Sequence, residues 1–202
     1  VGEIYCRLNT FSNEDLVRQF ERKGAECWIS DLTEWIFYVN HQKVVDLKFD
    51  GQGFSMERLK TEIRDWIQRR DEHALAEVFH EEFRGMEEPH GIAELMDHAR
   101  PYLKPGGALG EMIMSVGKAG YYHAKGCDGI VDISPFTCMN GIVSESVYPR
   151  MSEEHDGIPM RNFYFDGKVS DRDADIEIFI ELARGYQARK KHQRQYPHIF
   201  NG

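Results

Sequence analysis

The sequence has little of what disulfide-rich, disordered or membrane-spanning chains require. Its 202 residues include only 4 cysteines and 7 prolines, and glycine stands at an ordinary 18. These proportions exclude a disulfide scaffold, a collagen-like chain and a low-complexity disordered chain. No apolar run approaches the roughly 18 residues of a membrane span, and the start of the chain shows no signal-peptide pattern. We therefore expect a cytoplasmic globular protein without a membrane partner.

Positive charge is also scarce. The chain has 25 Lys and Arg residues against 34 Asp and Glu residues, so its formal net charge is −9 at pH 7. A surface of this sign repels phosphate backbones, and no nucleic-acid partner is expected. The basic run at 189–194 is expected to be the solvated end of a helix. A chain of this length buries roughly 70% of its unfolded surface, so its core needs no disulfides.

Common catalytic and cofactor motifs are missing as well. The sequence has no C-x-x-C, H-x-x-x-H, G-x-x-x-x-G-K-S/T, G-x-G-x-x-G or G-x-S-x-G pattern. Zinc hydrolases, P-loop ATPases, fingerprint dinucleotide binders and α/β-hydrolases therefore lack support. Glu77-x-x-His80 matches one arm of a di-iron bundle but has no second copy, so a solvated helix face is expected there. Glu111 and Lys118 could line a cleft, although a surface pair is the favoured interpretation.

What the sequence does contain is an alternation of strand and helix patterns. Segments at 1–6, 26–30, 129–133 and 158–165 are expected to be strands, and 108–125 and 140–154 helices. This alternation predicts an α/β fold with a parallel sheet of about four strands. Residues 42–105 carry three helical stripes and no strand pattern, which indicates a helical insertion within one domain spanning 1–202. Because the chain opens in mid-pattern without Met, we expect a fragment of a longer polypeptide.

Candidate site residues follow the expected strands. Loops after parallel strands meet at one edge of a sheet, so we expect one rim to gather Arg7, Asn9, Glu34, Cys138 and Asp166. Cys138 stands out because it comes directly before a helix, whose N-terminus favours a thiolate. Such a thiolate suits a nucleophile or a soft-metal ligand, with simple packing as the alternative.

The other three cysteines are expected to have packing roles. Cys6 ends the first expected strand and could approach the same rim, whereas Cys27 should be drawn into the sheet. Cys127 precedes its strand, so it should lie at the opposite edge, about 16 Å or more from the Cys138 loop.

The segment at 128–141, D-G-I-V-D-I-S-P-F-T-C-M-N-G, resembles the 2-hydroxyacyl-CoA dehydratase D-component superfamily (2-hydroxyglutaryl-CoA dehydratase type). It is most similar to the branch of acyl-CoA dehydratase activase-related proteins. The same branch is matched at G-E-I-Y-C-R-L-N (2–9), Ser12-Asn13, Glu34-Trp35, Gly110-Glu111, I-P-M (158–160) and Asp166-Gly167. The resemblance covers nearly the whole chain, and S-P-F-T-C-M is its most specific part.

This resemblance implies a Rossmann- or flavodoxin-like domain that serves an oxygen-sensitive 4Fe–4S or related cluster. Cys138 stands where a dehydratase cysteine binds the cluster. Arg7, Asn9, Glu34 and Asp166 are candidates to line the cofactor. The other ligands would lie on an upstream domain or second subunit, so the isolated fragment should hold no intact cluster and be inactive.

The implied partners are an ATP-dependent activase module, which supplies electrons at low potential, and an acyl-CoA substrate. The expected function is an iron–sulfur domain for low-potential electron transfer within an anaerobic dehydratase or reductase system. Whether the parent protein is a lyase or an oxidoreductase stays open. The alternative is a non-catalytic α/β docking domain of a large fused protein.

Overall fold

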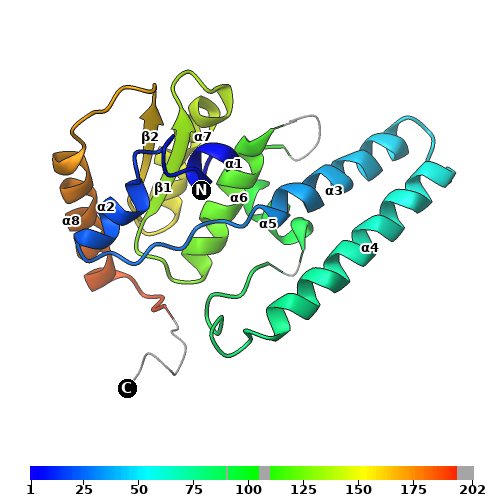
Figure 1. Ribbon diagram of the computed structural model, residues 1–202, viewed down its shortest axis with the longest axis horizontal. Coiled ribbons are helices and arrows are strands. Elements are labelled where there is room, and N and C mark those ends of the chain that lie inside the picture. Colours follow the sequence, from blue (N-terminus) through cyan, green and yellow to red (C-terminus); the bar gives the residue numbers. More distant parts are fainter. Residues whose placement is uncertain (90, 105–109, 195–202) are drawn as a thin grey trace. The chain divides into compact units, whose positions relative to one another are not determined.

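Residues 1–89, 91–104 and 110–194 are described by a computed structural model. The elements follow in the order α1 (Ile4–Leu8), α2 (Leu16–Arg22), α3 (Thr33–Phe49), α4 (Met56–Glu77), α5 (Ile92–Ala99), α6 (Glu111–Ala124), β1 (Ile130–Pro135), α7 (Met139–Glu154), β2 (Met160–Phe165) and α8 (Asp173–Arg189) (Figure 1). Within this part of the chain, Val1–Ser30 and Leu95–Arg194 form one compact unit, and residues 31–94 belong to another. The architecture is a mixture of helices and strands.

The sheet is a parallel pair. Strands β1 and β2 run in register from Ile130 opposite Met160 to Pro135 opposite Phe165. Parallel strands need a long crossover between them, which α7 provides. Gly2 adds an isolated parallel bridge to Ile133 on β1.

The strands expected at 1–6 and 26–30 are wrong. After Gly2 the chain turns into α1 instead of extending to residue 6, because the Glu3 carboxylate accepts hydrogen bonds from the amides of Tyr5 and Cys6 at 3.2 and 2.6 Å. Such a cap satisfies amides that a strand would have offered to the sheet. Residues 26–30 have no regular secondary structure. Two of the four expected strands, at 129–133 and 158–165, are confirmed as β1 and β2.

One face of the sheet carries an aromatic core. Side chains alternate between the faces of a strand, and Ile133 and Phe163 point to the side covered by α2 and α8. There Phe20 meets Phe163 and Phe179 edge to face, with ring centroids 5.9 and 5.7 Å apart. The ring quadrupoles favour edge-to-face pairs, which stabilise the core beyond the contribution of burying the rings.

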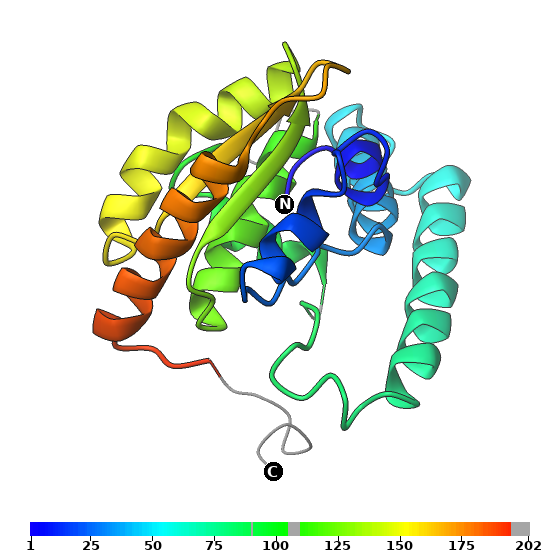
Figure 2. The same ribbon diagram turned by 60° about the vertical axis from the view of Figure 1, so that its left-hand side comes forward.

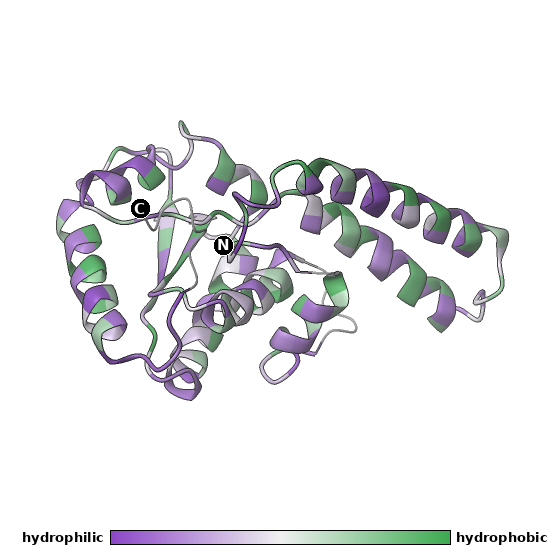
Figure 3. Ribbon diagram, turned by 90° about the horizontal axis from the view of Figure 1, so that it is seen from below, coloured by the Kyte–Doolittle hydropathy of each residue, from purple (hydrophilic) through white to green (hydrophobic). Residues whose placement is uncertain are grey.

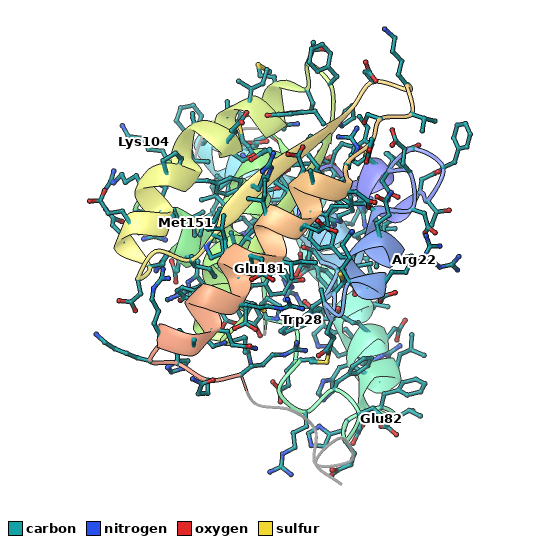
Figure 4. All side chains as sticks on the ribbon, turned by 90° about the vertical axis from the view of Figure 1, so that its left-hand side faces the viewer. Arg22, Trp28, Glu82, Lys104, Met151 and Glu181 are labelled. Atoms are coloured by element: carbon teal, nitrogen blue, oxygen red, sulfur yellow. The ribbon has the colours of Figure 1, made fainter. Side chains whose placement is uncertain are left out.

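The opposite face is covered by α6 and α7, so helices lie on both sides of the strands (Figure 2). Met151 on α7 is fully buried, whereas Glu181 on α8 points to solvent (Figure 4). The expected helix at 140–154 is confirmed as α7. The one expected at 108–125 is confirmed from Glu111 to Ala124, and residues 108 and 109 lie outside the described part of the chain.

Helix α6 packs closely through its glycines. A Cβ atom on Gly117 would lie 2.3 Å from the carbonyl oxygen of Leu95. One on Gly120 would lie 3.1 Å from the Cβ of His98. The lack of a side chain therefore lets the α5 backbone approach α6.

The described residues between 42 and 105 form helices and turns and no strand, as their stripes predict. Within residues 31–94, α3 and α4 pair through polar groups, and the Asn40 amide donates to Gln68 and Asp65 at 2.7 and 3.3 Å. The apolar stripe on α4 is exposed to solvent, including Leu59 and Trp66. Hydrophobic and hydrophilic residues alternate along both α3 and α4 (Figure 3). Among the described helices, none combines the length and apolar character needed to cross a membrane.

The basic run at 189–194 is not a solvated helix end throughout, which corrects the expectation from its composition. Lys190 is buried and forms an ion pair with Asp128 at 2.5 Å, and its ammonium also donates to the carbonyl of Gly126. Arg194 pairs with Glu26 at 2.9 Å. These contacts hold the chain after α8 against the loop that precedes β1 and against the irregular segment that begins at Glu26.

Replacing Gly117 with alanine should destabilise the protein by about 1–3 kcal/mol, because the new methyl group must push the α5 backbone away. Gly185 is a matched control, since it lies in α8 and a methyl group added there would meet no atom within 4 Å. Its change to alanine should stabilise the helix by about 0.5–1 kcal/mol. Urea unfolding of the two variants measures both effects. Equal stabilities would contradict the close approach of α5 and α6.

Candidate functional site

The candidate site lies at the carboxyl edge of the parallel pair. The chain leaves β1 and β2 at the same edge, where the Phe136 amide donates to the carbonyl of Phe165 at 2.8 Å. Because Gly2 runs parallel to Ile133, helix α1 leaves toward that edge too. In open α/β sheets this is where binding and catalytic groups collect. We call residues 4–11, 136–139 and 166–172 the carboxyl edge.

Cys138 is at the carboxyl edge, as predicted. It is the N-cap residue of α7, with extended backbone angles, and its side chain makes no capping hydrogen bond. The preceding residue, Thr137, has a φ of +66°, which turns the chain sharply from strand to helix. The Cys138 thiol is half-buried, while Phe136 and Met139 are exposed on either side of it. The position joins a reachable thiol to a helix N-terminus.

The other three cysteines lie in packed surroundings, as predicted. Burial is the main factor that raises the pKa of Cys6, Cys27 and Cys127, in each case to about 11. At Cys6, the nearby groups Glu3 and Cys138 raise the pKa further. At neutral pH the three thiols stay protonated and are therefore poor nucleophiles and ligands.

Three of the four predicted lining residues belong to the elements of this edge, but two of them have local structural tasks. Arg7 is buried in α1, where Nη1 donates to the carbonyl of Gly2 at 2.7 Å. The Asn9 side chain accepts from the amides of Phe11 and Ser12 and so fixes the turn after α1. Asp166 follows β2 directly and is exposed, so it is the most available of the three to a ligand.

Glu34 does not belong to the carboxyl edge. No strand precedes it, because residues 26–30 are irregular, and it lies in the first turn of α3 within residues 31–94. It is buried there. The reason for expecting Glu34 on the rim therefore no longer holds.

The sequence prediction missed Asp132, which is fully buried on β1 under α7. Its carboxylate accepts hydrogen bonds from Ser134 Oγ at 3.0 Å, Ser144 Oγ at 2.9 Å and Tyr148 OH at 2.6 Å. Burial and the neighbouring carboxylate raise the pKa of Tyr148 well above its usual value. A buried carboxylate needs such donors, and two of them, Ser144 and Tyr148, fasten α7 to the strand. An acidic residue between Val131 and Ile133 in an apolar strand was the available signal.

Glu111 and Lys118 on α6 are both buried, so a solvated surface pair is wrong. Glu111 accepts the amide of Ile4 at 3.2 Å and thereby joins α6 to α1. Burial raises the pKa of Glu111, and the charges of Glu3 and Asp132 act in the same direction. Lys118 lies over the rings of Tyr121 and Tyr122 with its ammonium 5.2 and 5.0 Å from their centroids, a favourable cation–π arrangement.

The donor atoms of the carboxyl edge do not make a complete metal site. In residues 1–89, 91–104 and 110–194 no group of three or more His, Cys, Asp or Glu side chains could hold a metal ion. Glu77 and His80 are exposed, in agreement with a solvated surface. Chemically, the edge offers one reachable thiol beside a helix N-terminus, an exposed carboxylate at Asp166 and a rim of exposed apolar side chains.

Comparisons with protein-family models, with curated proteins and with solved structures find no match to this chain.

A second cluster of titratable groups joins α5, α6 and α7. The rings of His123 and His155 stack with centroids 4.3 Å apart, and Tyr102 OH lies 3.3 Å from His155 Nε2. Burial lowers the pKa of both histidines, that of His123 to about 4. The positive forms of His155, His98 and His192 lower the pKa of His123 further, whereas Asp156 raises it. Neutral rings therefore hold these helices together.

Acid should destabilise the protein by protonating the stacked histidines His123 and His155. The folded state keeps His123 neutral down to a pKa of about 4, while an unfolded chain binds a proton near pH 6.5. The stabilisation is complete above pH 6.5 and is lost as the pH falls toward 4. For a half-exposed ring we expect a loss on the order of 1–2 kcal/mol. Urea unfolding at pH 7.5 and 4.5 measures the loss, which His123→Phe should reduce. His73→Phe on exposed α4 is the control, and an unchanged pH dependence in His123→Phe would contradict the role of the pair.

Alkylation should distinguish Cys138 from the other thiols in the folded protein. A thiol with a pKa of about 11 is only about one part in 10,000 thiolate at pH 7, so three of the cysteines should react very slowly. N-ethylmaleimide followed by mass spectrometry should show one fast modification, at Cys138. Cys138→Ser should remove it and Cys127→Ser should leave it in place. Fast modification of Cys6 or Cys127 without unfolding would contradict the assignment.

Proposed function

We propose that this chain is the cluster-sharing domain of an acyl-CoA dehydratase activase-related protein of the 2-hydroxyacyl-CoA dehydratase superfamily. Its Cys138 would supply one thiolate ligand to a 4Fe–4S-type cluster. A bound cluster would supply one-electron transfer at low potential. The electrons would come from an ATP-dependent activase module, and an acyl-CoA would be the substrate of the whole system.

The observation that carries this proposal is the placement of Cys138. Three of the four thiols have a pKa raised to about 11 by their surroundings, whereas Cys138 lies at the carboxyl edge as the N-cap residue of α7. The amides at the start of a 16-residue helix favour the negative charge of a thiolate and of any group bound to it. Asp132 holds α7 to β1 through Ser144 and Tyr148 and so keeps this cap in place.

The chain does not supply a complete cluster site. A 4Fe–4S cluster takes about four protein ligands, mostly thiolates, and the described residues contain no group of three suitable side chains. The remaining ligands would come from an upstream domain or a second subunit. Arg7, Asn9 and Asp166 would lie beside such a shared centre, with Asp166 as the exposed member. Isolated, the chain should be inactive and hold no intact cluster.

The proposal also includes a Rossmann- or flavodoxin-like sheet of about four strands in the parent protein. Two features support it, namely the parallel pairing of β1 with β2 and the helices on both faces of that pair. The bridge at Gly2 shows that a further segment can run parallel to β1.

A second candidate is a non-catalytic docking domain of a large fused protein. The exposed apolar side chains beside Cys138 favour it, because Phe136 and Met139 are 64% and 73% exposed. Large exposed apolar groups at a loop edge are typical of a surface that binds another protein. In this case Cys138 would pack in an interface without binding iron.

Anaerobic purification of the longer protein that contains this domain separates the two candidates. Iron, sulfide and the broad visible absorption of a cluster should be present in the wild type and in Cys127→Ser. They should be lost or reduced several-fold in Cys138→Ser, because the cluster loses a ligand. Iron and sulfide contents that are unchanged in Cys138→Ser would overturn the cluster proposal and support docking.

A further inference from the structure

A group of exposed apolar side chains lies on the three segments of the carboxyl edge, and two of them flank Cys138 in the chain. Their exposed fractions range from 46% to 93%, and we call the group the edge patch; it comprises Tyr5, Leu8, Phe11, Phe136, Met139 and Val169. All of them belong to the same compact unit. Single exposed apolar residues need no explanation, but six of them on three segments that meet at one edge of a sheet do.

Contacts in the structure bring the segments of the edge patch to one place. The bridge from Gly2 to Ile133 sets α1 beside the end of β1. The Glu14 carboxylate accepts the Ser170 amide at 3.4 Å and pairs with Arg172 at 3.6 Å. This contact joins the turn that carries Phe11 to the loop that carries Val169. The patch therefore comes from three segments held together by backbone and ionic contacts.

The exposed charge around the edge patch is mainly negative. Asp166 and Asp171 are exposed in residues 166–172 and Glu145 is exposed on α7, whereas the exposed cations nearby are Lys168 in the same loop and Arg18 on α2. The arginines of the edge point inward, since Arg7 is buried and Arg172 keeps 13% of its side-chain exposure. A second copy of this chain would bring the same negative rim and a further net charge of −9, which opposes association.

We propose that the edge patch is a docking surface for a partner protein with an apolar centre ringed by lysine and arginine. Apolar contact would supply most of the affinity, and the opposite charges would orient the partner and speed its approach. Docking would cover Cys138, so this inference extends the proposed function, since the partner would meet the thiol that we assign to the cluster.

The test uses the folded chain without iron and two synthetic helical peptides as probes. Both peptides carry the same leucine face, flanked by lysine in one and by glutamate in the other. The lysine peptide should bind at least about tenfold more tightly, and its binding should weaken as salt is added. It should also slow the reaction of Cys138 with N-ethylmaleimide several-fold.

Variants locate the binding surface. Phe136→Ser combined with Met139→Ser should weaken binding of the lysine peptide about tenfold or more, because two apolar anchors are lost. Phe49→Ser with Phe54→Ser is the matched control, since these phenylalanines are 92% and 106% exposed within residues 31–94. Circular dichroism establishes that both double variants fold.

Three results would overturn the docking proposal. They are equal binding of the two peptides, binding that Phe136→Ser with Met139→Ser does not change, and a concentration-dependent dimer in sedimentation that this variant abolishes. The last would identify a second copy as the occupant. Because no iron is present, failure here leaves the cluster proposal standing, and loss of iron in Cys138→Ser leaves the docking proposal standing.

Discussion

The parallel pairing of β1 with β2 is the constraint on which the rest of this structure depends. Six residue pairs hold it, from Ile130 and Met160 to Pro135 and Phe165. Parallel strands cannot be joined by a tight turn, so the chain must cross over through α7, and α7 must begin where β1 ends. That requirement places the cap of α7, and with it Cys138, at the carboxyl edge.

The two faces of this pair are stabilised by different physics. Toward α2 and α8 the contacts are aromatic, with Phe20 edge-on to two other rings, and their energy comes from burial and ring geometry. Toward α7 the centre is the buried carboxylate of Asp132, which three hydroxyl groups satisfy. A polar network of this kind specifies one arrangement of helix and strand, because any shift leaves a buried charge unsatisfied. The hydrogen bonds to Asp132 therefore fix the position of α7, where Cys138 is the cap.

Much of the candidate site could be predicted from the sequence. The segment around Cys138 has the order of strand, turn and helix that its pattern suggests, and Asp166 follows β2 as expected. Predictions failed where one local side chain competed with a weak pattern. Glu3 caps α1 and diverts an apolar segment from the sheet. Residues 26–30 pair with neither strand of the described sheet and stay irregular. Because no strand precedes Glu34, there is no longer a reason to expect it at the carboxyl edge.

The sequence by itself determined the local elements, because the apolar periods of β1, β2, α6 and α7, and the glycines of α6, act over a few residues. Only the tertiary structure decided what depends on contacts between distant residues. These include the burial of Lys118 and Glu111, the three hydroxyl groups on Asp132, and the exposure of six apolar side chains on the segments of the carboxyl edge. Burial depends on which faces meet, and side chains far apart in the chain meet only after the crossover brings α7 and the strands together.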